Sequence, residues 1–179
     1  MRKTAVLRPF AVLAAAGLIL WGISGALRPL AEKNAEIERE KTLSHLLPGG
    51  TPFVREEYGD EDEIISAVYR GQTGWVIETV TAGYVGEITL LVGVDEHGRV
   101  TGTVIRDLAE TWGLGGKALT DSAFLVQLIE IDRELTVGEN VDALTGATVT
   151  SKAIVRGINA ARAYVTGADV GSGATEWGS

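Results

Sequence analysis

The stretch Asp142–Ser151 (DALTGATVTS) places four hydroxyl side chains in and just after a glycine-containing turn. Gly146 and Ala147 leave the backbone there unhindered, and Thr148 stands just before a helix that is expected to begin at about Thr150. The first N–H groups of a helix have no intrahelical acceptor, and the helix dipole is positive at that end. These residues therefore predict a turn that holds a phosphate group. A plain Thr/Ser helix cap is the alternative interpretation.

The elements before this turn read as strands joined by tight turns. The turn Asp95-Glu96-His97-Gly98 is typical of a β-hairpin, and His97 is expected to be a solvent-exposed turn residue. The β-rich runs are Ile64–Tyr69, Trp75–Val80, Glu87–Val94 and Arg99–Arg106. The glycine-containing segment 107–118 and the segment 132–147 lack a clear period and are expected to be loops.

Two helices are expected after the strands. Thr120-Asp121 is a candidate N-cap for a helix whose apolar face is Phe124, Leu125, Leu128 and Ile129. Thr150 or Ser151 is expected to cap a final helix that runs to Val165 and ends at Gly167. Strands followed by helices predict an α+β domain with a mainly antiparallel sheet and helices packed on it.

An uncharged run from Pro9 to Leu27 precedes this domain. A membrane-spanning helix needs about 20 mostly apolar residues, so a single transmembrane helix is predicted over residues 9–28. A cleaved signal peptide, with Ser24-Gly25-Ala26 at the cleavage site, is the alternative. Both interpretations put the domain outside the cytoplasm. The predicted organisation is a cytoplasmic N-terminus (1–8), the membrane helix, a stalk helix and linker (29–50), the α+β domain (51–168) and a flexible tail (169–179).

Charge and composition exclude several classes of function. All 24 acidic residues but only 12 of the 16 basic residues follow residue 30, which leaves that part of the chain with a net charge of −12. Such a surface repels nucleic acid. The chain has no cysteine and two histidines, which excludes disulfides, cysteine-ligated iron–sulfur clusters and a multi-histidine metal site. No metal site is predicted, and a redox role would require an organic cofactor.

Three motifs resemble those of the FMN-binding domain family, over about residues 60–165. Asp142 to Ser151 resembles the flavinylation motif, an Asp followed by Ser/Thr-Gly-Ala-Thr and a hydroxyl pair. Glu110-Thr111-Trp112-Gly113-Leu114-Gly115 resembles the family's Glu-Thr-Pro-Gly-Leu-Gly loop, and Gly83-Tyr84-Val85-Gly86 resembles its Gly-Tyr-Gly-Gly turn. Trp112 replaces the usual proline, and Leu108 occupies a position where histidine is common.

The resemblance implies FMN attached through a phosphoester to Thr148. It also implies that a flavin transferase recognises Asp142, Thr145, Gly146, Ala147 and Thr148. Ser151 and Lys152 add a hydroxyl and a positive charge near the phosphate. The further cofactor contacts that it implies are Glu110, Thr111, Trp112, Gly113, Leu114, Gly115, Leu144, Thr145, Gly146 and Ala147. Trp112 has two alternative interpretations: its ring stacks on the flavin, or it packs within its own loop.

Within that family, the chain is most similar to the G subunits of Rnf-type ion-translocating ferredoxin:NAD oxidoreductases. This similarity implies an electron-relay subunit of a membrane-bound translocase in the cell inner membrane, with other membrane and redox subunits as partners. A Na⁺-translocating NADH:quinone reductase, or another extracytoplasmic electron-transfer chain, is the alternative setting. A non-catalytic anchored scaffold, in which the turn is only a helix cap, is a further alternative.

We expect Thr148→Ala to abolish covalent flavin while leaving the fold largely intact, because the residue is predicted to lie on a surface turn. In-gel fluorescence of the denatured protein checks this expectation. A variant that stays fluorescent on the denaturing gel would contradict it.

Overall fold

The computed structural model describes residues 29, 33–59, 63–109 and 115–168. By its contacts the chain divides into two compact units, residues 1–41 and residues 42–179. No helix within the described residues is both long and apolar enough to cross a membrane. The predicted membrane helix (9–28), the N-terminus before it and the predicted tail (169–179) lie outside the described residues.

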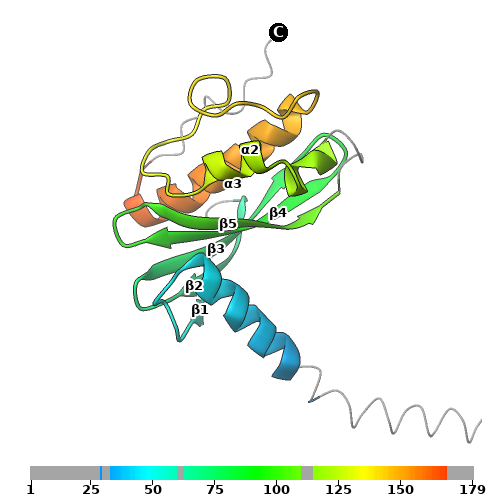
Figure 1. The fold of residues 1–179 in the computed structure, drawn as a ribbon. Coiled ribbons are helices and arrows are strands. Elements are labelled where there is room, and N and C mark those ends of the chain that lie inside the picture. Colours follow the sequence, from blue (N-terminus) through cyan, green and yellow to red (C-terminus); the bar gives the residue numbers. More distant parts are fainter. Residues whose placement is uncertain (1–28, 30–32, 60–62, 110–114, 169–179) are drawn as a thin grey trace, which may run out of the picture. The chain divides into compact units, whose positions relative to one another are not determined.

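Five strands form one antiparallel sheet in which every strand pairs with its neighbour in sequence (Figure 1). The order is β1-β2-β3-β4-β5. The α+β class with a mainly antiparallel sheet is confirmed. The strands are β1 (Val54–Glu56), β2 (Ile65–Arg70), β3 (Gly74–Ala82), β4 (Glu87–Asp95) and β5 (Val100–Leu108).

The four predicted strands exist, with ends that differ by a residue or two from the prediction. The strand β1 was not expected, because its three residues carry charge and no alternating pattern. The β4–β5 turn forms as predicted. Its Asp95 carboxylate accepts hydrogen bonds from the backbone N–H groups of His97 and Arg99, both at 2.9 Å. His97 is exposed there, as expected of a turn residue.

The long helix α3 (Thr148–Thr166) covers one face of the sheet together with the short helix α2 (Ser122–Leu125) (Figure 1). Ile154, Ile158 and Ala161 of α3 are fully buried and lie at the helical spacing of one apolar stripe. They meet the side chains of Ile88, Leu90, Val92 and Val94, which alternate along β4 and so share one face. This layer is the main core of the domain.

The ends of α3 correct one sequence expectation and confirm another. The helix begins at Thr148 and its N-cap is Ala147, so neither Thr150 nor Ser151 caps it; both are buried within the helix. Its C-terminal end agrees with the prediction, because Gly167 terminates it with a φ of +65°.

Asp121 caps α2 as expected and accepts a hydrogen bond from the Phe124 N–H at 3.1 Å. That helix ends after four residues, however, and continues as the 3-10 turn η2 (Val126–Leu128). The shorter helix turns Ile129 away from the core, leaving it 46% exposed, whereas Phe124 and Leu128 are buried as predicted.

The opposite face of the sheet carries a second, smaller core. A helix over residues 33–46 leads into it, and its last turn supplies Leu43, Leu46 and the following Leu47. These residues pack on Ala67, Tyr69, Val76 and Leu91. The segment 42–47, predicted as part of a stalk, therefore contributes buried side chains to the domain.

The Leu46 backbone approaches β4 and β5 closely at this face because two glycines lie there. Gly93 and Gly102 are partners across β4 and β5, and the Leu46 backbone lies against both. A Cβ added at Gly93 would collide with the Leu46 carbonyl oxygen, which also accepts a hydrogen bond from the Thr101 hydroxyl. The glycine pair thus admits the end of the helix to the sheet.

We expect Gly93→Ala to lower the free energy of unfolding by about 1–3 kcal/mol, as other insertions into packed sites do. Thermal and urea denaturation of the domain measure this loss. Gly59→Ala is the control, because a Cβ there meets no atom within 4 Å. Equal free energies of unfolding for the two variants would contradict a close approach of Leu46 to Gly93.

Candidate functional site

Thr148 is the first residue of α3 and is exposed to solvent. Its neighbour Ala147, the N-cap, has no side-chain oxygen to offer to the first N–H groups of the helix. The first turn of α3 contains no acidic residue. A hydroxyl, free helical N–H donors and the positive end of the dipole therefore lie together, an arrangement suited to a phosphate group.

The residues before Thr148 form a tight turn. The Ala147 N–H donates to the Leu144 carbonyl at 2.9 Å, and Gly146 between them has a φ of +77°. A positive φ at the third position of such a turn is readily adopted by glycine. Leu144 and Ala147 are buried in the main core, whereas Thr145 and Gly146 are exposed. The turn is thus anchored at both ends and open in the middle.

Ser151 is fully buried one helical turn after Thr148. Its hydroxyl accepts a hydrogen bond from the Leu144 N–H at 2.9 Å and donates one to the Ala147 carbonyl at 3.0 Å. The sequence suggested this hydroxyl as a phosphate contact, but in the structure its donor and one acceptor position are used by the preceding turn. Lys152 is exposed beside it.

Asp142, at the start of the motif, is also exposed. Its backbone N–H donates to the side-chain oxygen of Gln127 at 2.8 Å. The amide nitrogen of the same Gln127 donates to the Ala123 carbonyl in α2 at 3.0 Å. Gln127 was not identified from the sequence, because a glutamine between apolar residues carries no signal of a contact 15 residues away.

Helix α3 runs along β3 in a direction that fixes the position of Thr148. The Thr81 hydroxyl donates to the Ala153 carbonyl at 3.0 Å, and Gly157 lies against Thr79. At the other end of the helix, the Arg162 Nε donates to the Gly98 carbonyl at 2.8 Å. The start of α3 therefore lies toward the β3–β4 turn, and its end lies at the β4–β5 turn.

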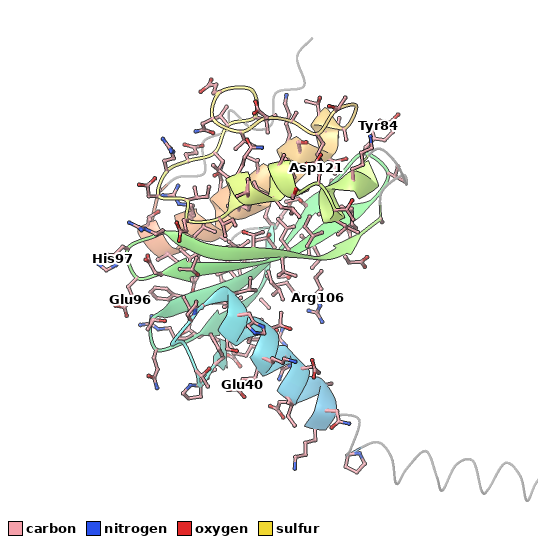
Figure 2. All side chains as sticks on the ribbon, in the orientation of Figure 1. Glu40, Tyr84, Glu96, His97, Arg106 and Asp121 are labelled. Carbon is pink, nitrogen blue, oxygen red and sulfur yellow. The ribbon has the colours of Figure 1, made fainter. Side chains whose placement is uncertain are left out.

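The β3–β4 turn is the segment Gly83–Gly86, closed by a hydrogen bond from the Gly83 N–H to the Gly86 carbonyl at 2.8 Å. Tyr84 and Val85 at its tip are 72% and 62% exposed. In Figure 2, Tyr84 marks this end of the sheet, and Glu96 and His97 mark the opposite end. Exposed apolar side chains thus lie at the same end of the sheet as Thr148.

The described residues on either side of segment 110–114 contact the β3–β4 turn and α3. Before it, Ala109 lies against Gly86, since a Cβ on Gly86 would stand 2.7 Å from the Ala109 Cβ. After it, Gly115 is buried and begins the 3-10 turn η1 (Gly115–Leu119), which packs against α3. Glu110, Thr111, Trp112, Gly113 and Leu114 lie outside the described residues.

Among the described residues, the side chain with a clearly shifted pKa lies away from Thr148. Tyr164, near the end of α3, has its pKa raised above the usual value of 10.0 by burial and, second, by the neighbouring Glu56 carboxylate. Its hydroxyl donates to Glu56 at 3.5 Å, and its ring meets that of Tyr58 edge-on. This group belongs to the contact between α3 and the sheet edge, not to the Thr148 site.

Comparison with known proteins shows similarity over the part of the chain that contains this end of the sheet. The family model described as "FMN-binding domain" covers residues 83–163, from the β3–β4 turn through most of α3. The chain is 30% identical over 158 residues to the G subunit of the proton-translocating ferredoxin:NAD(+) oxidoreductase complex of Clostridium ljungdahlii, covering 84% of each protein.

Two further relatives are similar over shorter spans. The chain is 33% identical over 114 residues to the G subunit of the Na(+)-translocating ferredoxin:NAD(+) oxidoreductase complex of Acetobacterium woodii, covering 56% of this chain and 55% of the relative. It is 29% identical to the G subunit of the ion-translocating oxidoreductase complex of Methanosarcina acetivorans, over 72% and 76% of the two chains. Matches thus span from about half to most of the relatives' length.

We expect Asp142→Ala to reduce flavin attachment while changing the free energy of unfolding by less than about 0.5 kcal/mol, because the side chain is exposed. Visible absorbance per protein after co-expression with a flavin transferase, together with a denaturation curve, measures both quantities. Full flavin loading of the variant would refute a recognition role for this carboxylate.

Proposed function

Because the chain belongs to the family of G subunits of ion-translocating oxidoreductase complexes, we propose that it is the flavin-bearing, electron-relay subunit of such a complex. The observation that carries this proposal is the position of Thr148, an exposed hydroxyl on the first residue of α3, within the flavinylation-like motif. FMN bound here would supply the redox chemistry, and the protein would supply its position and surroundings.

The site fits a phosphoester of FMN. Attachment consists of attack by the Thr148 hydroxyl oxygen on the FMN phosphorus of FAD, with loss of the hydroxyl proton and departure of AMP. The first N–H groups of α3 are free to receive the phosphate oxygens, since Ala147 provides no capping side chain. The helix dipole contributes about 0.3–1 kcal/mol toward an anion at that place. Lys152 adds a positive charge one turn along the helix.

The ring of the flavin would lie over the same end of the sheet. The exposed Thr145 and Gly146 and the buried Leu144 and Ala147 form its attachment turn. We assign Glu110–Leu114 and Gly115 to the loop that packs near the ring, with Trp112 in place of the usual proline of the family. Tyr84 and Val85, exposed on the adjacent turn, leave room for a cofactor or a redox partner to cover them.

The setting of this relay follows from the relatives. The Acetobacterium woodii and Clostridium ljungdahlii proteins are described as subunits of Na⁺- and proton-translocating ferredoxin:NAD⁺ oxidoreductase complexes. We place this chain in a complex of that kind, held in the cell inner membrane by residues 9–28, with the domain on the extracytoplasmic side. It would exchange electrons with neighbouring membrane and redox subunits and would neither bind NAD nor move the ion itself.

Intact mass of the denatured protein tests the attachment. After co-expression with a flavin transferase, we expect a gain equal to FMN less one water, mapped by peptide digestion to Thr148. Thr166→Ala, at the exposed opposite end of α3, is the matched control and is expected to keep the full gain. An unmodified wild-type mass, or modification at another residue, would overturn the proposal.

A further inference from the structure

We propose that Ser151 and Gln127 are positioning residues for the modification of Thr148. Their side chains hold the backbone from Asp142 to Ala147 in the shape that presents the Thr148 hydroxyl. This inference rests on the proposed function and adds that some residues position the motif while others are exposed to the transferase. Neither side chain is assigned a contact with the flavin.

Ser151 closes the attachment turn from inside the protein. The hydroxyl has one donor and two acceptor positions. The donor reaches the Ala147 carbonyl at 3.0 Å, and one acceptor position takes the Leu144 N–H at 2.9 Å. These two backbone groups belong to the two ends of the turn that the Ala147 N–H to Leu144 carbonyl bond also closes. Thr148 follows directly, so its position depends on this closure.

Gln127 holds the motif from the other side. Its amide oxygen receives the Asp142 N–H, while its amide nitrogen is bound to the Ala123 carbonyl in α2. The N–H groups of Asp142 and Leu144 are therefore held by different elements, the first by the α2–η2 segment and the second by α3. Two attachments two residues apart restrict both the path and the twist of the segment between them.

Burial separates the motif into two sets of residues. Leu144, Ala147, Thr150 and Ser151 are buried, whereas Asp142, Thr145, Gly146 and Thr148 are exposed. A transferase that approaches the folded domain can touch only the exposed set. The buried set acts by fixing the geometry of the exposed set. The sequence assigned Ala147 and Ser151 to recognition and phosphate binding, and their burial gives both residues this indirect role.

The rate of attachment measures positioning directly. Displacement of a reacting group by about 1 Å can lower a rate by about a hundredfold. We therefore expect Ser151→Ala and Gln127→Ala to lower kcat/KM for flavin transfer by about tenfold or more. The assay uses the full chain produced without a transferase, purified transferase and FAD, and follows the mass gain with time.

Two control variants remove comparable hydrogen bonds outside the motif. Thr101→Val removes a hydroxyl that donates to the Leu46 carbonyl on the other face of the sheet. Asn140→Ala removes an exposed amide that, like Gln127, joins two backbone groups, here the Thr136 N–H and the Glu134 carbonyl. Both controls are expected to be modified within about twofold of the wild-type rate, whatever their stability.

Conservative variants and the loaded protein separate positioning from the alternatives. Gln127→Glu keeps the oxygen that receives the Asp142 N–H but loses the donor to the Ala123 carbonyl, and it is expected to recover part of the rate lost in Gln127→Ala. Once fully loaded, Ser151→Ala is expected to show the flavin absorption and reduction potential of wild type. A shifted spectrum or potential would instead make Ser151 a flavin contact and would overturn the inference.

The outcomes distinguish this inference from the proposed function. If the wild-type chain accepts no flavin, the proposed function is overturned, and the positioning inference that rests on it is overturned as well. In a second outcome, the wild-type chain is modified while Ser151→Ala and Gln127→Ala accept flavin at the same rate as their controls. That result would overturn only the positioning roles. Should Ser151→Ala fail to fold, comparison of the rates of Gln127→Ala and Asn140→Ala still tests the positioning role of Gln127.

Discussion

The contact between α3 and the sheet is the constraint on which the site depends. A Cβ at Gly157 would lie 2.7 Å from the Thr79 hydroxyl and 2.8 Å from a Leu90 methyl group, so only glycine permits this separation. The Thr81 to Ala153 hydrogen bond holds the register one turn earlier. Because a helix is rigid over this distance, the same contact sets where its first residue falls. Thr148 is thereby placed at the end of the sheet where the β3–β4 turn lies.

A tether at a helix start suits an electron carrier. In the proposed function, a phosphoester at the positive end of the dipole would leave the ring free to lie against neighbouring turns, and it would prevent loss of the cofactor outside the cytoplasm. The excess of acidic residues after residue 30 favours the more positive, oxidised state of a bound redox group, although salt screens the effect. Position comes from the fold, and the reducing power comes from the cofactor.

In the proposed function, the ten residues Asp142–Ser151 have to meet two physical demands. A modifying enzyme needs an exposed hydroxyl, yet a reacting group has to be held in place. The chain meets both demands by burying Leu144, Ala147, Thr150 and Ser151, where the turn becomes a helix. Thr145, Gly146 and Thr148 between them stay in solvent. The match to the family motif at the buried positions therefore reflects the need to position the Thr148 hydroxyl as much as recognition by a transferase.

The sequence by itself determined the antiparallel sheet, the hairpin turn at His97, the Asp121 cap, the Gly167 end of α3 and the turn that contains Gly146. Each of these depends on local spacing or on one residue's conformational preference. The tertiary structure decided what depends on distant partners. It placed the start of α3 at Thr148, buried Ser151, brought Gln127 to Asp142, turned Ile129 outward and paired β1 with the sheet. Local patterns cannot specify these features, because the groups that fix them lie many residues away in the chain.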